Sequence, residues 1–361
     1  MNELSTLDCP HFGACSGCVL SNALTNPPIW ESVKNYFSFP IDLEVGALHG
    51  WRTKAKLAIR GISSLPKIGL YRTGSHYVQT MAHCKSHHSS INQAVFLLKE
   101  AIQIEKISIY NETKGLLRYA QFFVDLRTNL VQLVLVVQKE ESSIKRLINR
   151  LLKMGDWNSI WLNVQPLETN RILGDEWVHL HKEPYLCQKI NQEPFFFHPA
   201  SFAQAHWTLF EKLAAYVVEQ VPNQANLIEL YAGVGVMGML AASKCKNVQL
   251  VENNPFSHQS FLAKVSFPNV FYHLENVNIA IPRLLDRDCI LIDPPRKGIS
   301  PPLLHALEKK EGRIIYVSCD FSSFMRDINH LQEKGWKLTE GKGFLLFPGT
   351  NHVEIVATLQ R

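Results

Sequence analysis

The carboxyl-terminal half of the chain repeats one pattern, in which a short apolar run is followed in most cases by a stretch with helical spacing. Continuous apolar runs of this length are typical of buried parallel strands, which are joined by crossover helices. The pattern therefore predicts a doubly wound parallel α/β sheet. The expected strands cover residues 226–230, 248–252, 270–273, 289–293, 313–318 and 353–359.

The amino-terminal half has a different pattern, because pairs of strands with period-2 alternation are separated by helical segments. Residues 127–129 form a turn between two such strands, as in a hairpin. We expect an α+β domain over residues 1–201 and the α/β domain over residues 202–361, which begins with a helix at 201–220. The expected strands of the first domain are 51–60, 69–73, 76–80, 119–126, 130–138 and 159–165, and its helices are 90–103 and 142–154.

The composition limits the class of protein. The chain has 361 residues, of which 46% are hydrophobic, so it can form two packed cores. The net charge of +5 suits a phosphate-bearing partner, although a nearly neutral enzyme has a similar charge. Residues 1–9 lack the basic and apolar regions of a signal peptide, and no apolar run is long enough for a membrane span. We expect a cytoplasmic protein without membrane contact.

A glycine turn follows the first strand of the α/β half. Residues 227–238 read LIELYAGVGVMG, in which Gly233 and Gly235 allow a sharp turn and close approach to a ligand. The next strand ends in Glu252, and an acidic side chain there can bind the ribose hydroxyls of an adenosine. A dinucleotide site and a plain turn are alternatives. The acidic strand and the place of Glu252 favour S-adenosylmethionine.

A second segment with functional potential is the loop DPPRKG at residues 293–298. It follows a buried strand, at the edge where doubly wound sheets bind ligands. The prolines stiffen the backbone and present Asp293 to the ligand, while Arg296 and Lys297 are available to phosphates. An ordinary loop with solvated charges is the alternative.

Two reactive side chains follow near the carboxyl terminus. Cys319 comes directly after the strand at 313–318, and His352 and Glu354 lie two residues apart at the start of the last strand. Residues two apart on a strand share a face. A structural cysteine and a surface His–Glu pair are the alternatives to a nucleophile with a neighbouring base.

The segments YAGVG, IDPPRKG, YVSCD and LFPGTNHVEIV, in this order and spacing, resemble the family of S-adenosylmethionine-dependent RNA 5-methyluridine methyltransferases. The resemblance implies a Rossmann-like class I methyltransferase domain. It also implies that Cys319 is the nucleophile, that Glu354 accepts a proton, and that Tyr231, Glu252 and Asp293 line the cofactor site with the glycine turn.

The chemistry of such a reaction agrees with these residue types. Carbon 5 of uracil is a poor nucleophile until a thiolate adds to carbon 6 and produces an enolate. A base must then remove the carbon 5 proton so that the thiolate can leave. One cysteine and one carboxylate are therefore sufficient.

Three positions depart from the family pattern. His198, in FFFHP at residues 195–199, stands where the family has a Gln, and Ala200 stands where it has an Asn. Phe321 replaces a proline two residues after the catalytic cysteine. We expect His198 to donate one hydrogen bond to the cofactor in place of the Gln.

Eight cysteines in a cytoplasmic protein are expected to be ligands, catalytic groups or core residues rather than disulfides. Cys9, Cys15, Cys18 and Cys84 form a set of four thiolates, which suits zinc or an iron–sulfur cluster equally. The resemblance implies a 4Fe-4S cluster, which the ribosomal-RNA branch of the family carries. Cys187, Cys245 and Cys289 are expected to be core or surface residues.

The resemblance also bears on the RNA partner. The cysteine set begins too early for an amino-terminal β-barrel, as in the shorter branch that methylates a loop uridine of 23S rRNA. The stretch 51–56 (WRTKAK), with Lys67 and Arg72, either contacts RNA or is an ordinary exposed strand face. A tRNA uridine-5 methyltransferase and a non-catalytic ribosome-assembly protein of the same fold are the alternatives. No obligatory protein partner is indicated.

Overall fold

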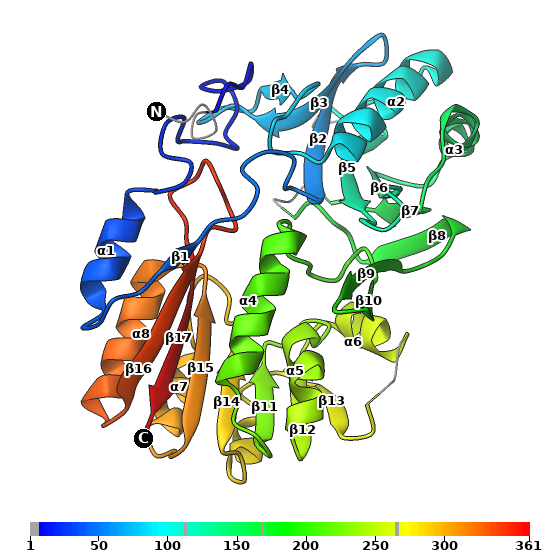
Figure 1. Cartoon of the computed structure of the whole chain (residues 1–361). Coiled ribbons are helices and arrows are strands. Elements are labelled where there is room, and N and C mark those ends of the chain that lie inside the picture. The colour runs from blue at the N-terminus through cyan, green and yellow to red at the C-terminus, as the bar shows by residue number, and fades with distance from the viewer. Residues whose placement is uncertain (1–6, 112–113, 168, 170, 264–266) are drawn as a thin grey trace. The chain divides into compact units, whose positions relative to one another are not determined.

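The computed structural model describes residues 7–111, 114–167, 169, 171–263 and 267–361. The first six residues of the amino-terminal stretch considered above lie outside this part. The chain forms two compact units (Figure 1). The first consists of Met1–Leu24, Ala47–Gln188 and Ala203–Trp207, and the second of Thr25–Gly46, Lys189–Phe202 and Thr208–Arg361. No helix in the described part is both long and apolar enough to cross a membrane.

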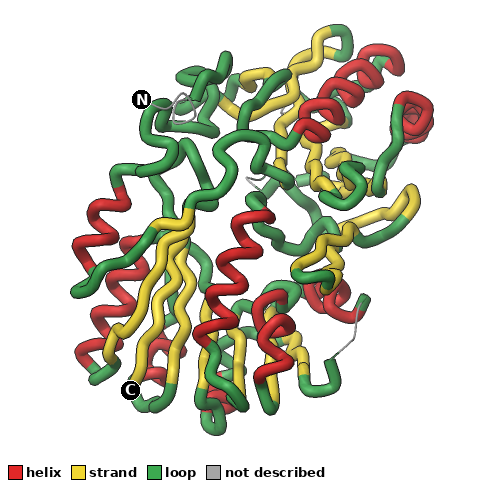
Figure 2. The backbone as a smooth tube through the Cα atoms, viewed as in Figure 1, coloured by secondary structure: helices red, strands yellow, loops and turns green. Residues whose placement is uncertain are grey.

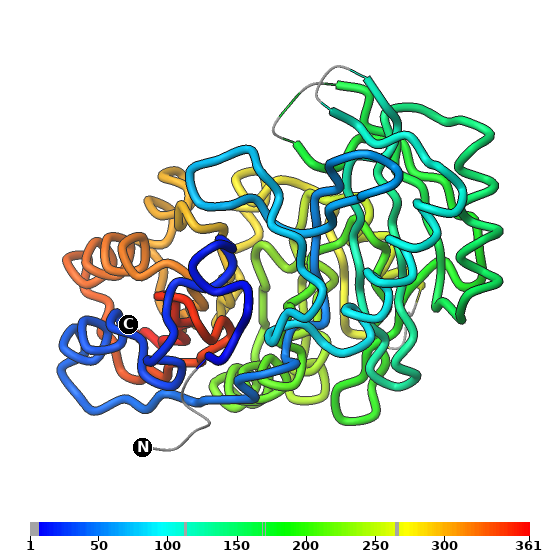
Figure 3. The backbone as a smooth tube through the Cα atoms, turned by 90° about the horizontal axis from the view of Figure 1, so that it is seen from above, coloured from blue at the N-terminus to red at the C-terminus, as the bar shows by residue number. Residues whose placement is uncertain are grey.

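This division differs from the single boundary expected after residue 201. Residues 25–46 belong to the second unit because they contain helix α1 (Ile29–Tyr36) and strand β1 (Leu43–Glu44). Strand β1 pairs in parallel with β16 (Lys337–Phe344) at the edge of the second unit's sheet. Figure 3 shows this early blue segment beside the orange and red carboxyl-terminal segments.

A seven-stranded sheet forms the centre of the first unit, in the order β4-β3-β2-β5-β6-β7-β8. Its pairs are antiparallel except for β6 with β7. Helices α2 (Ser89–Glu105) and α3 (Ser142–Met154) pack on one face through a shared apolar core. The expected helices and strands of this half are confirmed, whereas β8 was not expected. The strands are β2 (Lys54–Ile62), β3 (Leu65–Tyr71), β4 (Val78–Thr80), β5 (Leu117–Val124), β6 (Val131–Val137), β7 (Ser159–Val164) and β8 (Glu176–Lys182).

The second unit contains an eight-stranded sheet in the order β1-β16-β17-β15-β14-β11-β12-β13. Strands β15, β14, β11, β12 and β13 are parallel to their neighbours in this series, as the sequence predicted. Helices lie on both faces of the sheet (Figure 2). The strands are β11 (Asn226–Leu230), β12 (Asn247–Glu252), β13 (Val270–Leu274), β14 (Cys289–Ile292) and β15 (Arg313–Ser318), and the helices include α4 (Trp207–Gln220), α5 (Val236–Ala241), α6 (Pro255–Leu262), α7 (Pro301–Leu307) and α8 (Phe321–Glu333).

The expectation that the last strand is parallel is wrong. Strand β17 (Glu354–Gln360) is antiparallel to both β15 and β16. Strand β16 was not expected because its sequence, KLTEGKGF, is polar and only its last two residues are buried. The sheet is therefore mixed at this end.

Two local features precede the second unit's sheet. The helix expected from residue 201 begins at Trp207, because the Ala205 carbonyl accepts hydrogen bonds from the Thr53 backbone N–H and hydroxyl instead of from a helical turn. An unexpected hairpin joins β9 (Leu186–Ile190) to β10 (Glu193–Phe197). Its central residues, Asn191 and Gln192, both have positive φ, as in the tightest hairpin turns.

Candidate active site

The carboxyl ends of four parallel strands meet at one edge of the second unit's sheet. Residues 231–235 follow β11, Glu252 ends β12, Asp293 follows β14 and Cys319 follows β15. The topology thus brings most of the residues expected for the cofactor site and the predicted nucleophile to the same edge.

The glycine loop has an unusual backbone. Tyr231, Gly233 and Gly235 have φ values of 60°, 57° and 82°. Left-handed backbone is strained for an aromatic residue, and such strain concentrates at functional sites. A Cβ on Gly235 would overlap the side chain of Leu250 in the next strand. The loop therefore lies so close to β12 that only glycine fits.

Glu252 holds this loop in place through its carboxylate. Oε2 accepts a hydrogen bond from the Gly233 N–H at 3.0 Å, and Oε1 accepts from the N–H groups of Asn253 and Asn254, both at 2.8 Å. A carboxylate can accept about four hydrogen bonds, two at each oxygen. Three are made here, so Oε2 can accept one more. That remaining position is suited to a ligand hydroxyl.

Glu229 is a buried carboxylate beside the glycine loop that the sequence analysis did not single out. It is 1% exposed and accepts a hydrogen bond from the Gly238 N–H at 2.8 Å, in the first turns of α5. Burial raises the pKa of Glu229 to about 8. An acidic residue inside the apolar strand NLIEL was the signal for it, because carboxylates are almost never buried without a partner.

His198 lies in the turn after β10 and is buried. Its Nδ1 accepts a hydrogen bond from the Ala200 N–H at 3.1 Å, and its ring stacks on Phe256 of α6 with 4.5 Å between centroids. Because Nδ1 is an acceptor, the neutral ring carries its hydrogen on Nε2. The ring therefore anchors the turn at Ala200 through Nδ1.

Cys319 and Glu354 are brought together by the antiparallel pairing of β15 with β17. Ser318 is paired with Ile355, so the next position places Cys319 opposite Glu354. Glu354 is 1% exposed, and its Oε2 is buried without a hydrogen-bond partner among the described residues. A buried carboxylate oxygen of this kind is costly unless a ligand completes it.

Acidic side chains outnumber basic ones around Cys319 and Glu354. Burial, with Glu354 and Asp293 nearby, raises the pKa of the Cys319 thiol to about 11, and Arg296 opposes this shift. Burial also raises the pKa of Asp293, and burial together with the charge of Asp293 raises that of Glu354 well above its usual value. A cation beside these three groups would lower their raised pKa values, so the site favours a cationic ligand.

The loop at residues 293–300 is anchored by Asp327 of α8. The buried carboxylate of Asp327 accepts hydrogen bonds from the Ile299 N–H and the Tyr316 hydroxyl, both at 2.8 Å, and from Arg326. The sequence analysis missed Asp327. Its place among Phe324, Ile328 and Leu331 on the apolar face of a helix was the available signal.

The two remaining sequence features near this edge have structural explanations. Phe321 occupies the first turn of α8, where a proline also fits, and its ring contacts Tyr36 of α1 at 5.8 Å. His352 lies in the loop before β17, which begins at Glu354. The expected placement of His352 and Glu354 on one strand face is therefore wrong.

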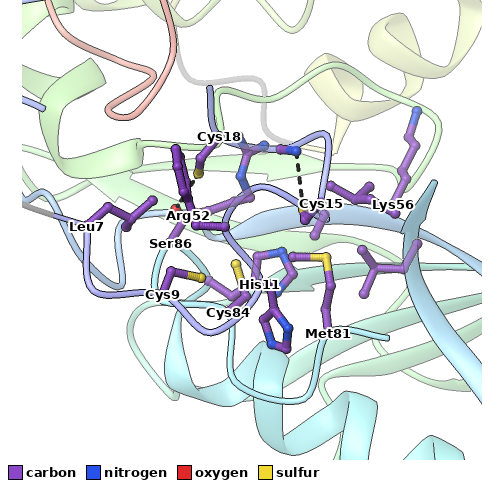
Figure 4. Close-up of a pocket in the computed structure, with 16 residues that line it drawn as sticks. Leu7, Cys9, His11, Cys15, Cys18, Arg52, Lys56, Met81, Cys84 and Ser86 are labelled. Atoms are coloured by element: carbon purple, nitrogen blue, oxygen red, sulfur yellow. Dashed lines mark hydrogen bonds between the residues drawn. The ribbon is translucent and has the colours of Figure 1, made fainter. Parts of the chain in front are cut away.

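The four cysteines of the predicted metal set line one cavity of about 120 Å³ in the first unit (Figure 4). Cys15 and Cys84 are buried, whereas Cys9 and Cys18 are partly exposed. Within the described residues, however, no group of three or more His, Cys, Asp or Glu side chains is arranged so that it could hold a metal ion. The cysteines thus share a cavity without converging on one point.

Several donors surround these thiols. The Gly17 N–H donates to the Cys15 sulfur at 3.2 Å, and the backbone N–H groups of Ser86 and His87 donate to the Cys84 sulfur. Arg52 and Lys56 also line the cavity. Burial raises the pKa of the Cys84 thiol to about 11, and the hydrogen bonds to its sulfur oppose that shift.

The basic residues of 51–56 therefore do not form one RNA-facing row. Arg52 and Lys56 line the cysteine cavity, whereas the Lys54 ammonium lies 4.9 Å from the centre of the Phe123 ring. Burial lowers the pKa of Lys54 to about 7. This stretch contributes to the cavity and to packing.

The strand order and the glycine loop of the second unit define a class I methyltransferase fold. A solved structure with a similar fold is that of the Pyrococcus abyssi tRNA (uracil-54, C5)-methyltransferase in complex with S-adenosyl-L-homocysteine. The TM-score is 0.80 at 23% sequence identity, and the match covers 96% of this chain and 86% of that one.

Sequence comparisons give the family. The chain is 37% identical over 379 residues to an uncharacterized RNA methyltransferase of Protochlamydia amoebophila, with 98% of both chains covered. It is 26% identical over 382 residues to an uncharacterized RNA methyltransferase of Bacillus cereus, which covers 98% of this chain and 83% of the relative. Residues 240–361 match the family described as tRNA (uracil-5-)-methyltransferase. The chain belongs to the family of S-adenosylmethionine-dependent RNA (uracil-5-)-methyltransferases.

Proposed function

We propose that this enzyme methylates carbon 5 of a loop uridine in 23S rRNA, with Cys319 as the nucleophile and Glu354 as the base. The observation that carries the catalytic part is the pairing of these two residues at the ligand-binding edge. Glu354 is buried there with Oε2 unpartnered in the described structure, directly across from a half-buried thiol. A base held in this way is ready to receive a proton from a bound substrate.

The reaction needs two bonds to form at the uracil ring and two to break. The Cys319 thiolate adds to carbon 6, and the electrons of the 5,6 double bond make carbon 5 nucleophilic. S-adenosylmethionine supplies the methyl group when bound. Glu354 then takes the proton from carbon 5, the bond from carbon 6 to sulfur breaks, and the Cys319 thiolate is regenerated.

The residues around the glycine loop fit the cofactor. Oε2 of Glu252 has an acceptor position left for a ribose hydroxyl, and the resemblance assigns a cofactor contact to the position of His198. Tyr231, Gly233 and Gly235 form the loop beside them, and Asp293 adds its carboxylate. The sulfonium of S-adenosylmethionine carries a positive charge, which the carboxyl groups of Asp293 and Glu354 attract when they ionise beside it.

For the first unit we propose a 4Fe-4S cluster bound by Cys9, Cys15, Cys18 and Cys84. Support comes from the shared cavity, from backbone N–H groups that donate to Cys15 and Cys84, and from Arg52 beside them. A cluster with four thiolates is anionic, so donors and an arginine stabilise it. The cluster would link the cysteine loop to the distant residue Cys84.

The choice of 23S rRNA rests on the cysteine set, which the resemblance assigns to the ribosomal-RNA branch. A tRNA target is the second candidate, since the descriptions of the matched family and of the similar solved structure both name tRNA as the substrate. Mapping 5-methyluridine in the rRNA and tRNA of a strain that lacks the gene decides between them. We expect loss at a single 23S position, and loss confined to tRNA would contradict this target.

The catalytic proposal is tested with an RNA that contains 5-fluorouridine at the target. Fluorine cannot leave as a proton, so Glu354 cannot complete the reaction and the bond to Cys319 persists. We expect a protein–RNA adduct that survives denaturing electrophoresis and whose crosslinked peptide contains Cys319. An adduct at another residue would show that the nucleophile has been assigned incorrectly.

A further inference from the structure

The first unit has a second, much larger open cavity, of about 980 Å³. Three arginines and three tyrosines contribute to its lining, with small polar residues of the turn at 73–75. We call this cavity the arginine–tyrosine groove. Its named members are Arg60, Arg72, Arg118, Tyr71, Tyr110 and Tyr119.

The groove lies on the sheet face opposite to α2 and α3. Ile59 belongs to the apolar core that these helices cover, so the next residue on β2, Arg60, points to the other face. Tyr119 of β5 packs with Val134, Val136 and Trp161 in a separate small cluster. The helices therefore leave this face available for a ligand.

Arg60 occupies the middle of the groove between two tyrosines from the neighbouring strands. Its guanidinium lies 5.6 Å from the ring centre of Tyr71 and 5.1 Å from that of Tyr119. Nη2 donates to both tyrosine hydroxyls, at 2.5 and 3.3 Å. These contacts hold the guanidinium and the two half-buried rings together, and we call them the Arg60–tyrosine cluster.

The other two arginines of the groove lie beside the Arg60–tyrosine cluster. Arg118 is 4% exposed, lies 4.4 Å from the Tyr110 ring centre and donates from Nη1 to the carbonyls of Gln165 and Leu167. Arg72 is exposed at the rim, where it donates to Gln79. All of these acceptors are neutral.

Charge in the groove is therefore uncompensated. Among the residues that the structure describes, no carboxylate lines the groove, and Arg60, Arg72 and Arg118 take part in no ion pair. The Nε atoms of Arg60 and Arg118 are buried without a described acceptor. A guanidinium that is partly desolvated without a counterion attracts an anion.

We propose that the arginine–tyrosine groove binds a single-stranded segment of the RNA substrate, with phosphates at the arginines and bases against the tyrosine rings. Aromatic rings that alternate with arginines are how proteins hold unpaired nucleotides, because paired bases in a duplex present no free face for stacking. The proposal rests on the proposed function for the presence of an RNA substrate, but it involves none of the residues assigned to catalysis.

The test measures binding separately from methylation. A labelled oligouridylate of about 12 nucleotides and a duplex RNA of the same length are titrated into the full-length protein by fluorescence anisotropy. We expect Arg72→Ala to weaken oligouridylate binding roughly five-fold and to reduce the salt-dependence slope by about 0.7. Tyr71→Leu should weaken it by about five-fold or more through lost stacking. Duplex should bind more weakly than the single strand.

Arg146→Ala is the matched control, because Arg146 is an exposed arginine on α3, which covers the other face of the sheet. It should bind like the unchanged protein. Since Arg72 is exposed and its side chain makes one hydrogen bond within the described residues, Arg72→Ala tests the proposal even if Tyr71→Leu does not fold.

Unchanged affinity and salt slope for Arg72→Ala, or equal affinity for duplex and single strand, would overturn the proposal. Failure of the catalytic proposal has a different signature. A protein that forms no 5-fluorouridine adduct at Cys319 but loses oligouridylate affinity in the groove variants retains this RNA site and refutes only the assigned nucleophile.

Discussion

Cys319 lies across from Glu354, one position beyond the Ser318–Ile355 pair of β15 and β17. The antiparallel return of the last strand therefore brings the end of β15 and the start of β17 to the same point. A parallel last strand would have placed its first residue at the opposite edge of the sheet. The reversal of β17 is thus what unites the proposed nucleophile with its proposed base.

The two residues act at different steps, so their substitutions should fail differently. Cys319→Ala cannot form the bond to carbon 6 and should give neither adduct nor methylated RNA. Glu354→Gln can still attack and methylate, but it cannot remove the proton and should accumulate a methylated protein–RNA adduct. Denaturing electrophoresis with labelled S-adenosylmethionine checks both outcomes.

Glu340→Gln changes an exposed residue of β16 and is the control for that comparison. It should methylate RNA at the unchanged rate and accumulate no adduct. Methylation by Cys319→Ala at nearly the unchanged rate would exclude a covalent mechanism through this residue.

The pH dependence of Cys319 reactivity follows from its surroundings. The pKa of this thiol is raised to about 11, so the thiolate fraction in the ligand-free enzyme increases about ten-fold per pH unit between about pH 7 and about pH 9. Alkylation by iodoacetamide should rise in parallel, without the plateau that a pKa of about 8.5 would give. Peptide mass spectrometry at a series of pH values measures it.

Neighbouring charges should move this profile in opposite directions. Asp293→Asn removes a negative charge and should shift the profile to lower pH, whereas Arg296→Ala should shift it to higher pH. A profile that neither substitution moves would mean that these groups do not influence the thiol.

Glu252→Ala removes a carboxylate that accepts three backbone hydrogen bonds and retains a position for the cofactor. Binding of S-adenosylmethionine should weaken by about 1–3 kcal/mol, since both the direct contact and the anchored loop are lost. Titration calorimetry measures the change. Glu311→Ala, an exposed change before β15, is the control, and equal affinity in both variants would place the adenosine elsewhere.

His198→Gln restores the residue that the family pattern has at this position. A glutamine can replace the imidazole's donor and acceptor, although stacking on Phe256 is lost. We expect methylation to be retained, with a modest decrease in melting temperature. His198→Leu is the contrast, because it leaves the Ala200 N–H without its side-chain acceptor, and it should raise the KM for S-adenosylmethionine.

Protein purified without oxygen should be brown and should contain about four irons and four sulfides per chain. Cys84→Ser should lose this colour and destabilise the first unit, because the link between distant segments is lost. Cys187→Ser changes a buried cysteine that does not line the cavity and should keep the iron. Stoichiometric zinc without visible absorbance would contradict the cluster.

The sequence predicted strands best where their residues are continuously apolar. Strands β11 and β15 match the expected bounds, and they position the glycine loop and Cys319. Strand β16 was missed because it is mostly polar and only its last two residues are buried, so tertiary pairing rather than local pattern determines it.

The same limit applies to the site. Motif residues such as Asp293 and Glu252 are marked by their position at strand ends. Asp327 acts through Ile299, which is 28 residues away in sequence, so no local pattern identifies that contact. The partner of Glu229, Gly238, is nine residues away, but it is brought close only by the turn of the glycine loop. The inward turn of Arg52 likewise depends on where Cys84 lies in three dimensions.

The pairing of β1 with β16 has a consequence for how the protein is made. Leu43 leaves the ribosome three hundred residues before its partner Gly343, so the edge of the methyltransferase sheet stays incomplete until synthesis is nearly finished. During that interval the apolar side chains of Trp30, Val33 and Phe37 lack the carboxyl-terminal residues with which they form a common core. The catalytic half is therefore not a separable module, and a fragment that starts at residue 208 would expose both an open strand edge and this apolar surface.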